Sequence, residues 1–103
     1  MAKESLTITL DRERHLRYDY NSFCAIEEKL GADCMTPEFW EKVTPGKIRA
    51  LLWAGLVWED PKLTIEQAGA LIELPRMVEI QEAIFTAYQL GFPPRTDATV
   101  GQA

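Results

Sequence analysis

Apolar and polar side chains alternate over residues 6–10 and again over residues 16–20. Alternation with a period of two is typical of β-strands that bury one face. An antiparallel register puts six side chains on that face, by pairing Leu10 with Leu16, Ile8 with Tyr18 and Leu6 with Tyr20. This register leaves Arg12-Glu13-Arg14 as the turn, although a three-residue hairpin loop favours a glycine that this segment lacks. The pattern therefore predicts an N-terminal β-hairpin over residues 5–20.

After the hairpin the apolar side chains recur at helical spacing, and capping residues mark where the helices begin. Asp19 or Asn21 can cap the first helix, and Gly31 stands where a left-handed residue ends it. Two Thr-Pro pairs and the capping box that begins at Thr64 start later helices. The pattern predicts five short helices, over residues 21–30, 37–43, 45–58, 65–73 and 76–90.

These elements are expected to form a single domain. A chain of 103 residues with 47% hydrophobic residues has the size and composition of one ordinary globular unit. We expect a mainly α (α+β) fold, in which the hairpin and the five helices pack as one compact domain over residues 1–92. Prolines and small or polar residues follow, so residues 93–103 are expected to be a flexible C-terminal tail.

The negative charge of the chain argues against nucleic acid as a partner. Its formal net charge is −5 at pH 7, and nucleic-acid affinity depends on lysines and arginines that replace counterions. No apolar run approaches the roughly 20 residues that span a bilayer, and no secretory signal precedes the hairpin. We therefore expect no nucleic acid, no membrane and a cytoplasmic location. In that reducing compartment Cys24 and Cys34 are expected to be free thiols.

No set of residues forms a recognisable catalytic or metal site. The single histidine, His15, lies among charged neighbours beside the predicted turn. Two cysteines and one distant histidine match no common zinc spacing. We therefore expect no enzyme, no cofactor and no metal, with an enzyme whose site the sequence hides as a minor alternative.

Two groups of side chains are candidates for contact with another protein. The three tryptophans concentrate in the middle of the chain, where Trp53 is expected in the core and the other two nearer the surface. Tryptophan is enriched at interfaces because it combines a large apolar area with a polar N–H. Positive charge gathers around the predicted turn, where it either contacts an acidic partner or is solvated. The predicted partner-binding residues are Trp40, Trp58, Arg12, Arg14 and Arg17.

A DNA-binding alternative comes from residues 63–72, which look like the first helix of a helix-turn-helix motif. The next helix would then enter the major groove. Between Thr64 and Leu90, however, Arg76 is the single basic residue and it faces four acids, Glu66, Glu73, Glu79 and Glu82. Phosphates repel such a surface, which argues against DNA binding. A DNA-binding regulator is therefore kept only as an alternative.

Several segments together resemble a tail assembly chaperone of long-tailed bacteriophages and prophages. They are Leu10–Asn21, Ala25–Glu28, Arg49–Leu56 (RALLWAGL) and Glu59–Thr64 (EDPKLT). The resemblance extends over about residues 6–75. It implies a non-enzymatic factor in the cytoplasm of the bacterial host, which binds the long hydrophobic tape measure protein and helps tail tube subunits to assemble around it. It also implies that the factor is absent from the finished virion. An unspecified protein-binding adaptor is the remaining alternative.

The predicted hairpin also bears on how such a factor binds. Two strands alone are marginally stable, so the hairpin is expected to lie on the helices or to join a neighbour's sheet. An unpaired strand edge can pair with another chain. We therefore expect a homo-oligomer, or client binding, through the hairpin edge and the surface near Trp40 and Trp58.

Overall fold

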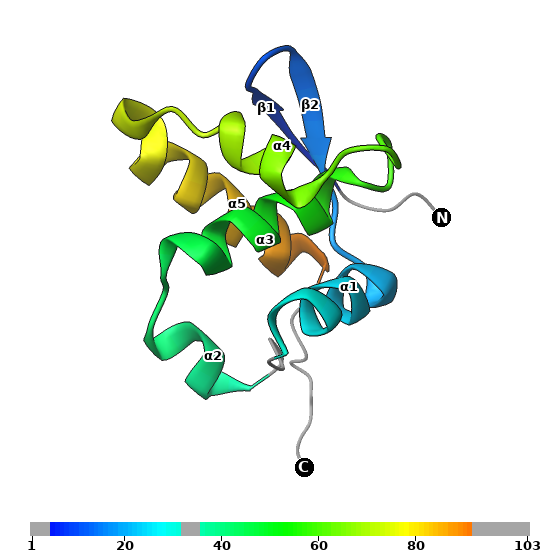
Figure 1. The fold of residues 1–103 in the computed structure, drawn as a ribbon, viewed down its shortest axis with the longest axis vertical. Coiled ribbons are helices and arrows are strands. Elements are labelled where there is room, and N and C mark those ends of the chain that lie inside the picture. Colours follow the sequence, from blue (N-terminus) through cyan, green and yellow to red (C-terminus); the bar gives the residue numbers. More distant parts are fainter. Residues whose placement is uncertain (1–4, 32–35, 92–103) are drawn as a thin grey trace.

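The structure, a computed structural model, describes residues 5–31 and 36–91. Its elements in chain order are β1 (Leu6–Thr9), β2 (Glu13–Leu16), α1 (Tyr20–Leu30), α2 (Pro37–Glu41), α3 (Pro45–Leu56), α4 (Ile65–Ala70), the 3-10 turn η1 (Leu74–Arg76) and α5 (Met77–Gly91). Figure 1 shows the hairpin above the helices, with α3 running through the middle of them. This arrangement confirms the predicted α+β fold of one hairpin and five helices.

Helix α3 lies at the centre because it is apolar on almost every side. Seven of its 12 residues are buried. It contacts α1, α4, α5 and β2, and the core continues into Ile26 of α1, Ala68 of α4 and Ile80 of α5. The hairpin therefore lies on the helices and shares their core.

Side-chain caps set the helix starts, as the sequence predicts. Asp19, Thr44 and Thr64 each accept a hydrogen bond from a backbone N–H in the first turn of the helix that follows. Gly31 ends α1 with a φ of 65°, a left-handed conformation that favours glycine. Of the two predicted caps for α1, Asp19 is the one that the structure uses.

Several helices end earlier than predicted. Helix α2 ends at Glu41, α3 at Leu56 and α4 at Ala70, two to three residues before the predicted ends at 43, 58 and 73. After α3 the chain turns at once, and the N–H of Asp60 donates to the carbonyl of Leu56. The predicted tail over residues 93–103 and the predicted free thiol of Cys34 lie outside the described residues.

The register of the hairpin differs from the predicted one. Leu6 pairs with Leu16 and Ile8 pairs with Arg14, so the turn is residues 10–12 and the predicted turn at 12–14 is wrong. The two registers differ by an even number of positions, so Leu6, Ile8 and Leu16 stay on their predicted face. Ile8 and Leu16 are therefore buried, as expected.

Tyr20 is placed differently from the prediction. It was expected on the buried face of the hairpin, but its side chain is 76% exposed. The reason is that Asp19 caps α1, so the chain has left the sheet after Leu16 and Tyr20 is the first residue of the helix. Tyr18 remains buried, and its hydroxyl donates to the carbonyl of Leu51.

Candidate binding site

An apolar groove runs between α3 and α5, and we call it the α3–α5 groove. Among the described residues, seven large apolar side chains are exposed, and five of them line this groove: Val43, Leu74, Met77, Val78 and Phe85. The groove has two lobes of about 640 and 800 Å³. Val43, Ile48 and Gln81 border both lobes, so the lobes form one continuous surface.

Helix α5 builds one wall of the groove because it carries two apolar stripes. Ile80, Ile84 and Ala87 form the buried stripe that joins the core. Val78 and Phe85, seven residues apart, form a second stripe on a different side of the helix, and Met77 is exposed at the start of the helix. One apolar stripe is enough to dock a helix. The second stripe is therefore apolar surface that the described part of the chain does not cover.

Trp40 forms the end wall of the first lobe. Its half-buried ring lies against three other aromatic rings, with centroid distances of 4.9 Å to Phe39, 5.7 Å to Phe85 and 4.6 Å to Tyr88. Lys47 holds α2 in place by donating to the carbonyl oxygens of Phe39 and Lys42, at 2.7 and 2.6 Å. The predicted interface residue Trp40 thus lines the groove, and contacts within the chain hold its ring in place.

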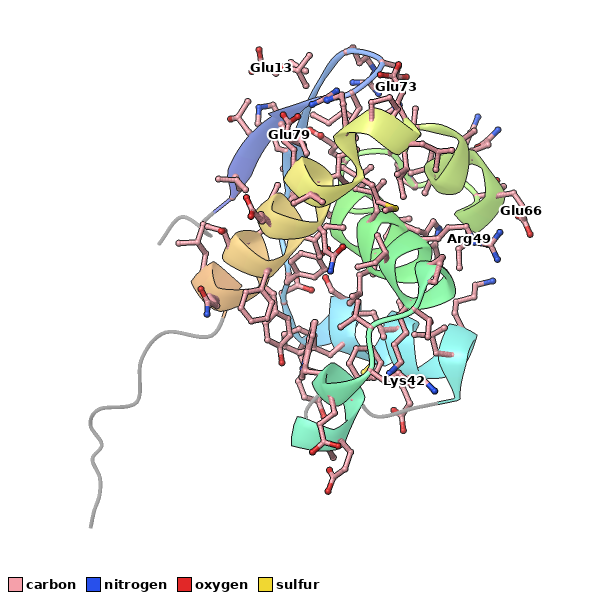
Figure 2. All side chains as sticks on the ribbon, turned by 90° about the vertical axis from the view of Figure 1, so that its left-hand side faces the viewer. Glu13, Lys42, Arg49, Glu66, Glu73 and Glu79 are labelled. Atoms are coloured by element: carbon pink, nitrogen blue, oxygen red, sulfur yellow. The ribbon has the colours of Figure 1, made fainter. Side chains whose placement is uncertain are left out.

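The rim of the groove is charged. Arg49, Glu66 and Glu82 border the lobes, and among the described residues none of them forms an ion pair with another side chain. Figure 2 shows Arg49 on α3 and Glu66 on α4 close together at one border of the molecule. An apolar floor with a polar rim is the composition that protein interfaces share.

The other predicted partner-binding residues lie where the hairpin meets the end of α3, and none of them lines the groove. The guanidinium carbon of Arg17 is 4.2 Å from the ring centroid of Trp58. The indole Nε1 of Trp58 donates to the carbonyl of His15 at 2.9 Å. These contacts join the hairpin to α3, which is a structural role for Trp58 and Arg17.

Arg14, one of the predicted partner-binding residues, lies inside the molecule. It takes the inward place opposite Ile8, and its side chain is 5% exposed. The guanidinium donates to both carboxylate oxygens of Asp11, at 2.8 and 2.9 Å, and to Asp60 at 3.1 Å. These bonds offset the desolvation of the buried charge. Arg12 remains exposed and lies 3.8 Å from Asp60.

His15 lies between two carboxylates at the same junction. Its Nδ1 is 3.1 Å from Oε2 of Glu59, and its Nε2 is 3.3 Å from Oε2 of Glu13. The hydrogen bond with Glu59 raises the pKa of His15 above its ordinary value, and Glu13 adds to the increase. Both ring nitrogens face acceptors, which is the environment of a protonated imidazole.

We expect Glu59→Gln to lower the pKa of His15 toward its ordinary value of about 6.5. Because folding raises this pKa, the pair stabilises the fold below the unfolded pKa, and the stabilisation is lost as the pH rises through the folded pKa. The chain has one histidine, so an NMR titration of its ring protons measures the pKa directly. Glu13→Gln is the control, with a smaller expected decrease. Equal pKa values in the wild type and Glu59→Gln would contradict the pairing.

Within the described residues, no three His, Cys, Asp or Glu side chains come together in a group that could hold a metal ion. None of the described helices has the length and apolar character needed to cross a membrane. No family model, curated protein or solved structure matches the chain.

Proposed function

We propose that the chain is a non-enzymatic tail assembly chaperone of a long-tailed phage or prophage. In the cytoplasm of the bacterial host it would bind the tape measure protein through the α3–α5 groove and release it as tail tube subunits assemble. The observation that carries this proposal is the gathering of five exposed apolar side chains in one groove. Exposed apolar surface concentrated in this way marks sites of protein contact.

The shape of the groove favours a helical client. A groove between two helices accepts an amphipathic helix that presents apolar residues at i, i+3, i+4 and i+7. The exposed apolar residues of α5, from Met77 to Phe85, span about 12 Å at 1.5 Å per residue, which matches roughly two turns of a bound helix. So short a contact gives weak, reversible binding. Reversibility suits a factor that is expected to leave before the tail is complete.

The DNA-binding alternative gains no support from α5. This helix carries no basic residue. Arg76, which precedes it in η1, donates to both carboxylate oxygens of Glu79 at 3.1 and 2.9 Å. This pairing neutralises the charge that would otherwise meet a phosphate. Protein binding is therefore the better account of the exposed α5 surface.

We expect Phe85→Asp to weaken binding of the tape measure protein by at least about 30-fold, because it puts a charge in the centre of an apolar contact. Phe85 is 47% exposed, so the fold should survive, which circular dichroism and a thermal melt would check. Binding would be measured by calorimetry with helical fragments of the tape measure protein, and by co-purification after co-expression.

Tyr20→Asp is the matched control, because Tyr20 is a largely exposed aromatic residue that does not line the groove. It should leave tape measure binding unchanged. If a folded Phe85→Asp protein bound the tape measure protein as tightly as the wild type, the groove would not be the client site. If no fragment bound the wild type, the proposed function itself would be wrong.

A further inference from the structure

The two edges of the hairpin differ in how they are covered. The end of α3 occupies the edge of β2: the N–H of Arg17 donates to the carbonyl of Gly55 at 3.0 Å, and the N–H of His15 donates to the carboxylate of Glu59 at 2.8 Å. The carbonyl of His15 accepts from Trp58. These bonds occupy the outward backbone groups of His15, so a further strand cannot pair along this part of β2.

Among residues 5–31 and 36–91, no backbone group bonds to the outer edge of β1. In an antiparallel pair, residues that bond to the partner strand alternate with residues whose N–H and C=O point outward. Both backbone groups of His15 point away from β1, so the two groups of Thr7, its partner, point away from β2. The same holds for Thr9. Figure 2 shows β1 at the border of the molecule, with no other described element beyond its outer edge.

The open edge also lacks the features that prevent strand pairing. Exposed edges are normally protected by a charged side chain, a proline or a bulge. Residues 5–9 read Ser-Leu-Thr-Ile-Thr and contain neither a charge nor a proline. By contrast, β2 carries Glu13, Arg14 and His15. The covered edge is the charged one, and the uncovered edge presents nothing that repels another strand.

We propose that β1 pairs antiparallel with β1 of a second copy of this chain, forming a four-stranded sheet across a twofold axis at Thr7. A twofold contact requires a surface that matches itself. In this register Thr7 faces Thr7 of the second copy and Ser5 faces Thr9, which places hydroxyl side chains together on the exposed face. Leu6 faces Ile8, which places apolar side chains together on the core side.

We expect sedimentation velocity of the full chain to show a dimer whose fraction increases with concentration. Thr7→Pro should raise the dissociation constant of the dimer by about tenfold, because proline has no N–H and each of the two copies loses one donor at the contact. The ladder between β1 and β2 does not use that N–H, so the folded monomer should remain. Thr7→Val, which keeps the N–H and adds no charge, is the control and should dimerise like the wild type.

A charge swap tests the register. Thr7→Lys and Thr7→Asp each place like charges opposite one another at the axis, and each should weaken its own dimer by about fivefold. A mixture of the two variants should restore dimerisation. A wild type that stays monomeric at all concentrations would overturn the proposal. So would a dimer that tolerates Thr7→Lys but is lost in Phe85→Asp, which would assign the contact to the groove. Binding of the tape measure protein tests the α3–α5 groove, whereas dimerisation tests the edge of β1. Either proposal can therefore fail without the other.

Discussion

Replacing Arg14 with alanine is expected to destabilise the fold by about 2–4 kcal/mol, because it breaks a buried ion pair and leaves a cavity. The guanidinium joins Asp11 in the hairpin turn to Asp60 after α3. Without it, Asp60, whose side chain is 29% exposed, would keep its charge beside empty apolar space. Urea unfolding monitored by circular dichroism measures the difference.

Arg12→Ala is the matched control for this change. Arg12 approaches the same carboxylate of Asp60, at 3.8 Å, but its side chain is 57% exposed. Exposed ion pairs contribute little, so the expected loss is at most about 0.5 kcal/mol. Equal losses for the two arginines would contradict the role given to burial.

The free energy of unfolding at acid pH should depend on the ion pair between Arg14 and Asp11. The hydrogen bonds from Arg14 lower the pKa of Asp11 to about 2. Since the folded pKa is the lower one, the pair stabilises the fold above the unfolded pKa of about 4, and this contribution is lost as the pH falls toward 2. In Arg14→Ala that part of the pH dependence should disappear.

Gly55→Ala is expected to destabilise the fold by about 1–3 kcal/mol through overpacking. A Cβ at this position would lie 2.8 Å from the ring carbon Cζ of Tyr18 and 2.9 Å from Cδ2 of Leu16. Both neighbours are buried and neither can move freely, because the Tyr18 hydroxyl bonds to Leu51 and its ring packs edge-on against Tyr88. The hairpin can approach α3 so closely because residue 55 has no side chain.

Gly46→Ala provides a control of opposite sign. A Cβ built on Gly46, which is in the first turn of α3, meets no atom within 4 Å apart from its chain neighbours and the adjacent backbone of its own helix. Alanine there should stabilise the protein by about 0.4–1 kcal/mol, because it reduces the freedom of the unfolded chain. Thermal melts of the two variants should therefore shift in opposite directions. A Gly55→Ala protein as stable as the wild type would contradict the close packing of Tyr18.

Local signals account for most of what the sequence predicts correctly about the fold. The caps at Thr44 and Thr64 work through hydrogen bonds within one turn, so a short stretch of sequence contains the whole interaction. The buried faces of the strands follow from alternation alone. The register has no such local determinant. It depends on Arg14 reaching Asp60, which lies 46 positions away, and sequence reasoning expects an arginine to be exposed.

The candidate site was predictable only in part. Trp40 was predicted at an interface and lines the groove, while Val78 and Phe85 were missed. Their signal is present, since they form a second apolar stripe on the last helix outside the one that packs in the core. Val43 and Leu74 had no such signal. They lie in connections between helices, and only the packing of α3 against α5 brings them to one surface.

The way α3 covers β2 also bears on aggregation. A sheet with two free edges can add chains without limit, which is the geometry of cross-β fibres. Here Gly55, Trp58 and Glu59 bond to the backbone of His15 and Arg17 at one edge, so stacking through native strands would stop once β1 is paired. The domain can therefore expose an unprotected strand and an apolar groove without seeding fibrils from its folded state.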